Sequence, residues 1–435
     1  MTKVVIVGAG PAGLLAAHYL LQRPNNQVEI YEKRGDFESS AFQNDRTFPI
    51  SLQTRGMDAV REIPGLESAL TSFDAEGERR STVTAGVCMH RGKSERKISR
   101  PATLSVERNH IASVFLRELR KANPAENSSL KICFDSAIEG VDVEGKTLKV
   151  TKNDSEDVVV PYDVLIGCDG AHSKIRQMLS EQQLIQFSQT TTDESYKSFY
   201  ISCSSEDGSV KLDGDKIHVW MFGANRVISA PTRKDESAGV FIFPGGQDPF
   251  SDLPDAEAVL DYIKSLSPDS LAPLVSLKEA ESLRNRPVAT LVEVTCDKLT
   301  IGSDIVLLGD AAHAMSPSLS QGCNSSLQDV QVLMGCLDQC KGDWVKALPA
   351  YNEKRIPDSQ AISELSCYNN PRNKWMRYEF IFRMILLSLL PKWLSNMLLR
   401  PLPLMLLAET NLSYNKVLEK CRWWTDRVKN SPSEL

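Results

Sequence analysis

Hydrophobic residues near the N-terminus follow the pattern of a parallel sheet that is buried on both faces. Residues 4–7 form an uninterrupted run of β-branched side chains, which is typical of a central parallel strand. A glycine-rich loop at 8–13, an apolar helix at 14–21 and a second strand at 27–31 follow it directly. This order of strand, helix and strand predicts a βαβ unit.

The central part of the chain changes to shorter segments in which apolar and polar residues alternate. Residues 130–170 predict an antiparallel meander that closes on another buried strand at 164–168. A separate sheet is indicated by four further strand-like runs, at 198–203, 217–221, 226–230 and 239–243.

Buried and helical patterns return after this second sheet. A short helix is expected at 254–267, a buried strand at 304–308, and a helical pattern from Ser326 onward. The first and last strand–helix units must therefore come together from distant parts of the chain, with the second sheet inserted between them.

Composition and charge narrow the class of protein. The chain has 435 residues, enough for two or three domains, and its 42% hydrophobic and 24% charged residues are ordinary for a globular protein. A net charge of −6 gives no reason to expect a nucleic-acid partner. The ten cysteines are scattered without a CxxC pair, and the first apolar run reads as a strand rather than a secretion signal. We therefore expect reduced thiols in a cytoplasmic protein.

The first loop has the spacing of a dinucleotide fingerprint. Gly8 allows a tight turn, Gly10 lets a pyrophosphate approach the backbone, and Gly13 lets the helix pack on the strand. The start of the helix offers free N–H groups to a phosphate. Glu32 ends the second strand and is placed to accept from a ribose hydroxyl, which favours FAD or NAD over bound NADP.

Two later loops also carry small and acidic residues. They are GCDGAHSKIR at 167–176, which contains Asp169, and GDAAHAMSPSLSQGCN at 309–324. A long ligand that lies across several strand ends, such as FAD, explains three such loops better than a small ligand. Asp310 would lie near the ribityl or pyrophosphate part, although a helix cap is the simpler explanation of a Gly-Asp pair by itself. The helix that follows 321–324 would direct its dipole toward the isoalloxazine ring.

Several phrases, spread from Val4 to Asn370, together carry a family resemblance. They are VVIVGAGPAG, EIYEKR, LSVERNHI, VLIGCDGAHSKIR, IVLLGDAAHAMSP, QGCN and RIPDSQAISELSCYNN. On these phrases the chain resembles the class A flavoprotein aromatic hydroxylases and, within them, the kynurenine 3-monooxygenase family.

The resemblance implies an α/β fold with α+β insertions. A Rossmann-like FAD-binding domain of the para-hydroxybenzoate hydroxylase type would carry an inserted β-sheet substrate domain and a C-terminal helical segment. The expected boundaries are 1–75, 100–185 and 285–345 for the discontinuous FAD-binding domain, 76–99 and 186–284 for the substrate domain, and 346–435 for the C-terminal helices.

The implied activity is that of an FAD-dependent monooxygenase. NADPH or NADH reduces the flavin, O₂ adds to give a C4a-hydroperoxide, and one oxygen is transferred to an aromatic or cyclic small molecule. The cofactor supplies the chemistry, so no side chain is expected to be catalytic. His313 is a candidate base by position, but a packed or hydrogen-bonded histidine is the simpler interpretation.

Cofactor contacts follow from the family motifs residue by residue. Besides the three glycines, the expected FAD contacts are Ala12, Glu32, Lys33, Arg34, Ser51, Arg108, Ile138, Asp169, Asp310, Gly322, Cys323 and Asn324. Arg46 resembles a further arginine near the cofactor, although the local spacing differs by one residue.

The expected substrate site departs from the family pattern. The family has a carboxylate-binding arginine where this chain has Val87, and a tyrosine where it has Ala102. Valine cannot replace a bidentate arginine. Arg91, Arg96 and Arg100 are nearby cations that read as surface residues. We therefore expect the flavin chemistry to be retained and kynurenine binding to be lost.

Other substrate contacts are partly matched. Asn369 agrees with a family substrate contact. An aromatic pair of the family is replaced by the segment Ser318-Leu319-Ser320, so a smaller and more polar pocket floor is expected. If the loop needs a positive φ at Ser320, strain of order 1 kcal/mol is expected there.

The segment 380–407 is strongly apolar but interrupted. Arginine, lysine and three prolines divide it into pieces shorter than the roughly 20 residues of a transmembrane helix. A helical cap over the substrate pocket and a peripheral helix on a membrane surface both fit this pattern.

Two other functions share the expected fold. A flavin-dependent reductase or oxidase would suit the apolar C-terminal segment, and a flavin-binding regulatory protein without turnover would suit the altered pocket. The expected partners of the hydroxylase are a small-molecule substrate, O₂ and NAD(P)H, with no metal.

Overall fold

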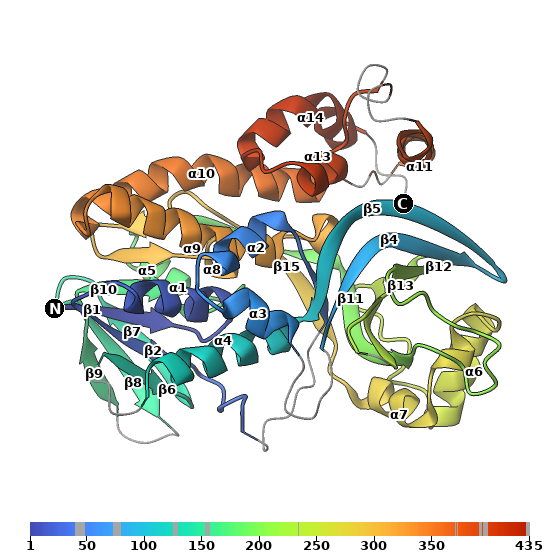
Figure 1. Ribbon diagram of the computed structural model, residues 1–435, viewed down its shortest axis with the longest axis horizontal. Helices are drawn as coiled ribbons and strands as arrows, with labels where there is room; N and C mark the ends of the chain where they lie inside the picture. Colours follow the sequence, from blue (N-terminus) through green and yellow to red (C-terminus); the bar gives the residue numbers. More distant parts are fainter. Residues whose placement is uncertain are drawn as a thin grey trace.

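The computed structural model describes residues 1–39, 48–72, 80–124, 129–152, 157–233, 235–369, 371, 373–390, 394 and 399–431. Two sheets lie side by side, one at the left and one at the right of Figure 1, and a helical layer runs above both. Arg46 falls outside the described residues.

The first sheet is the predicted parallel sheet. Its order is β16 (Thr300–Ile301), β17 (Ile305–Leu307), β10 (Val164–Gly167), β1 (Thr2–Val7), β2 (Asn26–Tyr31) and β6 (Leu130–Cys133). All neighbours pair in parallel except β16 with β17. The first and last strand–helix units therefore join one sheet, as the sequence pattern predicts, with β10 between β1 and β17.

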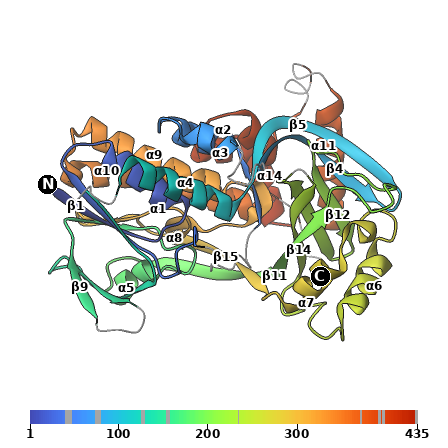
Figure 2. The ribbon, with the colours of Figure 1, turned by 60° about the horizontal axis from the view of Figure 1, so that its bottom comes forward.

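Both faces of this sheet are covered, which explains its apolar strands. Figure 2 shows α1 (Pro11–Leu21), α4 (Arg108–Ala122) and α9 (Gly322–Gln339) on one side, with α5 (Lys174–Glu181) and a small sheet on the other. The small sheet has the order β7 (Ser136–Asp142), β8 (Thr147–Lys152) and β9 (Val158–Pro161).

The expected meander is wrong for its first strand. Residues 130–133 form β6, which joins the edge of the parallel sheet beside β2 instead of pairing with β7. Four alternating residues predict a strand but not its partner, because pairing is set by tertiary packing. The helix expected from Ser326 begins four residues earlier, at Gly322.

The second sheet is the predicted separate sheet, enlarged at its ends. Its order is β15 (Ala289–Cys296), β11 (Phe187–Ser202), β14 (Glu236–Pro244), β13 (Asn225–Pro231), β12 (Ile217–Phe222), β4 (Ser81–Arg91), β5 (Ser94–Glu107) and β3 (Pro49–Leu52). The expected short helix is α6 (Ala256–Leu266), and with α7 (Leu277–Asn285) it covers one face. Phe199, Trp220 and Phe241 form the core beneath these helices.

The C-terminal helices lie above the parallel sheet and the strand β5 (Figure 1). They are α10 (Trp344–Tyr368), α11 (Lys374–Leu389), α13 (Pro403–Glu409) and α14 (Tyr414–Lys429). Leu319, Ile362, Leu365, Tyr414 and Val417 form a separate core between them. Among the described residues, no helix is both long and apolar enough to cross a membrane.

Candidate active site

The three glycine-containing loops meet at the ends of adjacent strands. The register pairs Val7 with Gly167 and Gly167 with Leu307. A Cβ on Gly8 would lie 2.4 Å from the carbonyl oxygen of Cys168, so only glycine fits between the first and second loops. A Cβ on Gly309 would lie 3.6 Å from the Cβ of Ala12, which places the third loop beside the first.

The fingerprint loop is packed closely at Gly13 and open at Gly10, where a ligand would approach the backbone. A Cβ on Gly13 would lie 2.1 Å from the carbonyl oxygen of Gly8, which explains the close packing of α1 on β1. No described atom lies within 4 Å of a Cβ built on Gly10. Gly10 is also the N-cap of α1, and no side chain caps that helix. An exposed backbone and an uncapped helix start fit a pyrophosphate.

Glu32 is held against this loop. Its Oε2 accepts from the amide of Ala9 at 2.8 Å, and its Oε1 accepts from Nε of Arg34 at 2.9 Å. Burial works to raise the pKa of Glu32, but Arg34 and the two amides outweigh it and hold the pKa below its usual value. An ionised carboxylate therefore sits beside the fingerprint. Lys33 next to it is exposed.

Ile138 lies close to the same strand end. It is buried in β7, and the amide of Ser136 in that strand donates to the carbonyl of Glu32 at 2.9 Å. The small sheet thus brings an apolar side chain to the edge of the candidate ribose position.

Asp169 caps a helix rather than pointing into open space. One carboxylate oxygen accepts from the amides of Lys174 at 2.7 Å and Ile175 at 3.2 Å. Its Oδ1 is buried without a hydrogen-bond partner among the described residues, and burial raises its pKa. A buried acceptor of this kind fits a hydrogen bond from a bound cofactor.

The start of α9 is fixed by the side chain of Asn324. Its Oδ1 accepts from the amide of Gln53 at 2.8 Å, and its Nδ2 donates to the carbonyls of Ser51 at 2.9 Å and Ser320 at 2.8 Å. A Cβ on Gly56 would lie 2.6 Å from that Oδ1. Asn324 therefore locks the helix start onto β3 and α2 (Thr54–Arg61).

Arg108, Asp310 and Cys323 are brought together from three elements. Burial raises the pKa of the Cys323 thiol to about 12, while the charge of Arg108 works to lower it and that of Asp310 to raise it. Arg108 also begins α4 and lies over the ring of Phe48, 6.0 Å from its centroid. No side chain caps α9, and no described atom lies within 4 Å of a Cβ built on Gly322.

His313 is a buried, hydrogen-bonded histidine, which is the simpler of the two interpretations given in the sequence analysis. Its Nε2 lies 2.7 Å from Oδ2 of Asp329, and that same oxygen accepts from the amide of Gly309 at 2.7 Å. Nε of Arg355 donates to the other carboxylate oxygen. All three side chains are almost completely buried. The network fixes the turn at Gly309 through the hydrogen bond from its amide to Asp329.

Sequence reasoning missed Asp329 and Arg355. The signal that could have identified them is a charged residue on the buried face of each of two helices, because a buried charge needs a partner of opposite charge. Arg355 also donates to the carbonyl of Ser325 at 3.1 Å and to its hydroxyl at 2.8 Å. The interaction reaches the C-terminal helices, because Arg355 and Arg55 both lie over the ring of Tyr414.

The predicted substrate residues lie where the C-terminal helices meet the third loop. Ser318 donates its hydroxyl to the carbonyl of Ser366 in α10 at 2.8 Å. Leu319 is fully buried in the core between the C-terminal helices. Asn369 is buried at the end of α10, and its carbonyl accepts from Nε1 of Trp424 at 3.1 Å. The structure thus brings the three residues to one region, where α10 meets the third loop.

Ser320 adopts the left-handed conformation, with φ 55° and ψ 32°. Its amide donates to the carbonyl of Pro317 at 3.0 Å, and its carbonyl accepts from Asn324. A non-glycine residue in this region carries strain of about 1 kcal/mol. The loop geometry therefore needs the positive φ that was in question.

Val87 and Ala102 lie on neighbouring strands of the second sheet. Val87 pairs with Ile98, whereas Arg100 and Ala102 lie in a bulged part of β5, where the register with β4 shifts between Thr84 and Gly86. Arg91 and Arg96 are exposed, as expected. Arg100 is half-buried, and burial lowers its pKa. Its guanidinium makes no hydrogen bond or ion pair with another described residue.

Two uncapped helix starts, a fixed carboxylate and an open backbone at Gly10 define a site for a dinucleotide that extends across three strand ends. With the antiparallel sheet beside it, this is the architecture of a flavin-binding protein with a separate substrate sheet.

The comparisons with known proteins agree with this class. A family model described as an FAD binding domain matches residues 1–366. The chain belongs to this family of FAD-dependent class A monooxygenases.

The similarity to known proteins extends over most of the chain. A kynurenine 3-monooxygenase of Phaeosphaeria nodorum is 29% identical over 381 residues, covering 84% of this chain and 77% of that protein. The enzyme of the same name from Sus scrofa is 27% identical over 402 residues, covering 90% and 81%. A solved structure of 2-methyl-3-hydroxypyridine-5-carboxylic acid oxygenase has a TM-score of 0.65 and 19% identity over 98% of both chains, and it supports the fold.

Proposed function

We propose that this enzyme uses NADPH or NADH and O₂ to hydroxylate an aromatic or cyclic small molecule other than kynurenine. The observation that carries the proposal is the retention of every flavin loop beside a substrate sheet that has Val87 and Ala102 at the two family positions. FAD, when bound, would accept hydride from the nicotinamide and deliver one oxygen atom to the substrate.

The residues of the chain would hold and surround that cofactor. The start of α1 would bind its pyrophosphate, and Glu32 would accept from its ribose. Asp310 and Arg108 would lie along its ribityl chain, and the dipole of α9 would stabilise negative charge on its ring. The C-terminal helices would exclude water from the substrate side.

Arg100 would bind an anionic group of the substrate. Its half-buried guanidinium lies in the same bulged part of β5 as Ala102, so a carboxylate would be held from β5 rather than from the Val87 position on β4. This different anchor point is a reason for kynurenine to fit poorly.

The test is a screen of ring-bearing acids and neutral analogues with the purified FAD-loaded protein. Ligand-stimulated NADPH oxidation, product mass with one added oxygen and released peroxide are measured together, so that hydroxylation is separated from uncoupled oxidation. We expect hydroxylated product from at least one ligand. Absence of flavin reduction by either nicotinamide with every ligand, or efficient kynurenine hydroxylation, would contradict the proposal.

A matched set of variants tests the substrate side. The double variant Val87→Arg/Ala102→Tyr restores both family side chains and is expected to gain kynurenine-stimulated NADPH oxidation. Arg100→Gln is expected to raise KM for acidic substrates about tenfold or more, as the loss of a charged hydrogen bond implies. Arg96→Gln, an exposed arginine on the same strand, is its control.

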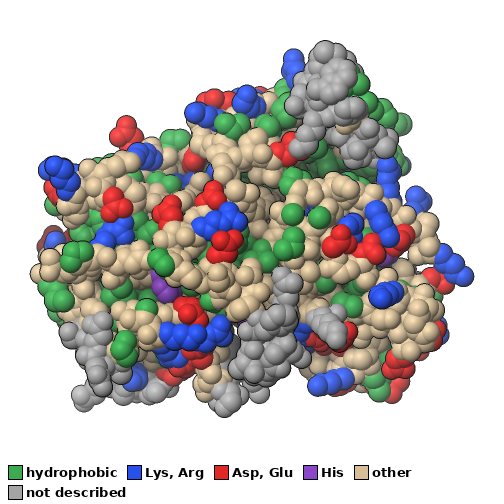
Figure 3. Space-filling view, viewed as in Figure 1, with side chains coloured by type: hydrophobic (Ala, Val, Ile, Leu, Met, Phe, Trp, Pro, Cys, Tyr) green, Lys and Arg blue, Asp and Glu red, His purple; other side chains and the backbone are tan. Residues whose placement is uncertain are grey.

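We also propose that α11 contacts a membrane surface on the cytoplasmic side. Trp375, Tyr378, Ile381 and Phe382 are exposed by 75%, 57%, 48% and 62%. Figure 3 shows hydrophobic side chains gathered at the upper right, where Figure 1 places α11. Aromatic residues beside exposed lysine and arginine suit an interfacial helix.

A further inference from the structure

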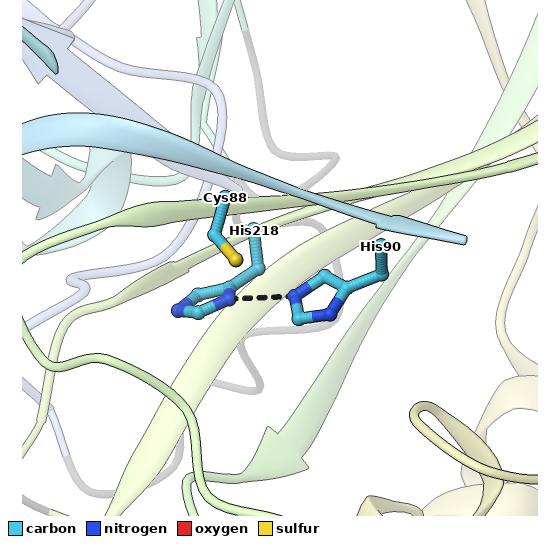
Figure 4. Close-up of side chains that lie close together, drawn as sticks. All are labelled: Cys88, His90 and His218. Carbon is cyan, nitrogen blue, oxygen red and sulfur yellow. Dashed lines mark hydrogen bonds between the residues drawn. The ribbon is translucent and has the colours of Figure 1, made fainter. Parts of the chain in front are cut away.

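Three metal-ligating side chains converge on the substrate sheet, away from the flavin loops. Cys88 and His90 lie two residues apart on β4, and His218 lies on β12. These strands pair in parallel, with Cys88 opposite His218 and His90 opposite Trp220. Paired residues on neighbouring strands lie on the same face of a sheet, and so do residues two apart on one strand. Cys88, His218 and His90 therefore share a face. Figure 4 shows the thiol and both rings turned toward one another.

The ligand atoms are close enough to share one ion. Sγ of Cys88 and a ring nitrogen of each histidine all lie within 4.8 Å of one another. Nε2 of His90 lies 2.9 Å from Nδ1 of His218. A tetrahedral zinc ion separates such atoms by roughly 3.3–3.6 Å, from its usual bond lengths. The histidine pair would need to widen by a few tenths of an ångström.

The surrounding contacts orient the histidines as ligands. Nε2 of His218 lies 3.0 Å from the carbonyl oxygen of Asp213, which can only accept, so this nitrogen carries the proton and Nδ1 keeps its lone pair. His90 stacks on Trp220 with ring centroids 4.4 Å apart. Trp220 is itself fixed by a hydrogen bond to the hydroxyl of Ser270 at 3.1 Å. Outer contacts of this kind are typical of metal-bound histidine.

One carboxylate lies beside this group, although it is not among the side chains whose ligand atoms all lie within 4.8 Å of one another. Oε2 of Glu95 lies 3.4 Å from Sγ of Cys88. Lys97 forms ion pairs with both Glu95 and Asp213 at 2.9 Å, so it could release Glu95 and keep Asp213.

We propose that Cys88, His90 and His218 bind one Zn²⁺ ion, and that Glu95 completes the coordination once its side chain has moved toward the ion. A set of one thiolate and two imidazoles favours zinc over magnesium or calcium, which prefer oxygen. On binding, the Cys88 thiol loses its proton to solvent and a sulfur–zinc bond forms, with no change of oxidation state. The proton that Nε2 of His90 shares with Nδ1 of His218 moves to Nδ1 of the His90 ring, so that both facing nitrogens can bind the ion. The ion would tie β4 to β12, which join at a parallel pairing in a sheet whose other described pairings are antiparallel.

The experiment uses the FAD-loaded protein, from which metal has been removed with a chelator. Its cysteine thiols are kept reduced. Zinc is titrated against a chromophoric chelator, and metal content is measured after desalting. We expect one tightly bound Zn²⁺ per chain, and at least a hundredfold weaker binding in Cys88→Ser and in His218→Asn. Cys203→Ser, which removes a half-buried cysteine just beyond β11, is expected to bind zinc as the parent does.

Cobalt provides a second readout that a loss of folding would not imitate. Co²⁺ at the site is expected to give a sulfur-to-cobalt absorption band that disappears in Cys88→Ser, while the flavin content of that variant shows that it is folded. Less than one tightly bound zinc per chain in the parent, a cobalt complex without the sulfur band, or equal weakening in Cys203→Ser would each overturn the proposal.

Discussion

At the scale of single residues, Asp329 determines the shape of the third loop. Its carboxylate accepts from the amide of Gly309, which stands where the cofactor loop turns, and from His313 and Arg355. The position of Asp310 therefore depends on a charge buried beneath it.

Replacing that charge tests the network. We expect Asp329→Asn to lower the free energy of unfolding by up to about 3–5 kcal/mol, because the buried Arg355 would keep only Asp358, at 3.3 Å, as a charged partner. FAD affinity should fall as well. Urea unfolding and flavin content after gel filtration measure both effects. Asp338→Asn, near the end of the same helix, removes an exposed ion pair with Arg23 and should cost less than about 1 kcal/mol.

The same carboxylate predicts a pH dependence. Burial works to raise the pKa of Asp329, but His313 and Arg355 outweigh it and hold the pKa below its ordinary value. A depressed folded pKa adds stability above about pH 4, the pKa of the unfolded state, and that stability is lost as the pH falls through the folded pKa. The other titratable groups near this carboxylate are Cys168, Tyr351 and Tyr414.

Unfolding measured between pH 7 and pH 3 checks this sign. The difference in unfolding free energy between the parent and Asp329→Asn should be constant above about pH 5 and shrink below about pH 4. A difference that grows toward acid would refute the assigned direction.

Ser320 gives a smaller residue-scale prediction. Because its φ is positive, Ser320→Gly should relieve strain and raise the unfolding free energy by up to about 1 kcal/mol, less the extra backbone entropy of glycine. Ser320→Ala keeps the Cβ and should show no such gain. Equal stability of both variants, with unchanged FAD affinity, would show that the strain is unimportant.

At the scale of elements, one tyrosine links the C-terminal helices to the flavin side. The hydroxyl of Tyr414, at the start of α14, donates to Oε1 of Gln321 at 3.0 Å. The amide nitrogen of Gln321 donates to Oε1 of Gln53 at 2.7 Å. This chain of contacts joins α14, the start of α9 and the residue that precedes α2.

Removing the hydroxyl tests that link. We expect Tyr414→Phe to lower the unfolding free energy by about 1–3 kcal/mol, since the buried side-chain oxygen of Gln321 would lose its hydrogen-bond donor. Peroxide release during NADPH oxidation should rise if α14 then covers the site less well. Tyr378→Phe, which removes an exposed hydroxyl on α11, should leave both quantities unchanged.

At the scale of the whole molecule, the exposed face of α11 is the strongest departure from an ordinary surface. Exposed lysine and arginine at 374 and 377 lie beside its aromatic residues. We expect co-sedimentation with vesicles that contain anionic lipid, and its loss in the double variant Trp375→Ser/Phe382→Ser. Leu277→Ser, at an exposed leucine on α7, is the control. Binding that survives the double variant would exclude α11 as the contact.

The positions of β6 and the two sheets show how far sequence patterns reach. Continuous apolar runs predicted β1 and β17 because strands buried on both faces must be apolar. Four strands of the second sheet, β11, β12, β13 and β14, were predicted as short strand-like runs. Residues 130–133 were found as a strand but assigned to the wrong sheet, because four residues do not specify a pairing partner.

The sequence by itself determined the flavin loops. Gly8, Gly13 and Glu32 are local requirements of turn, packing and charge, and each stands beside the strand that positions it. Local requirements can be read from spacing, which is why these three residues lie together at one strand end in the folded chain.

Only the tertiary structure decided which distant side chains meet. Asp329 with Arg355, Tyr414 with Gln321, and Cys88 with His218 are contacts between separate elements, and each depends on how helices or strands pack. No spacing along the chain encodes such a contact, because burial and partner choice are settled when the elements come together.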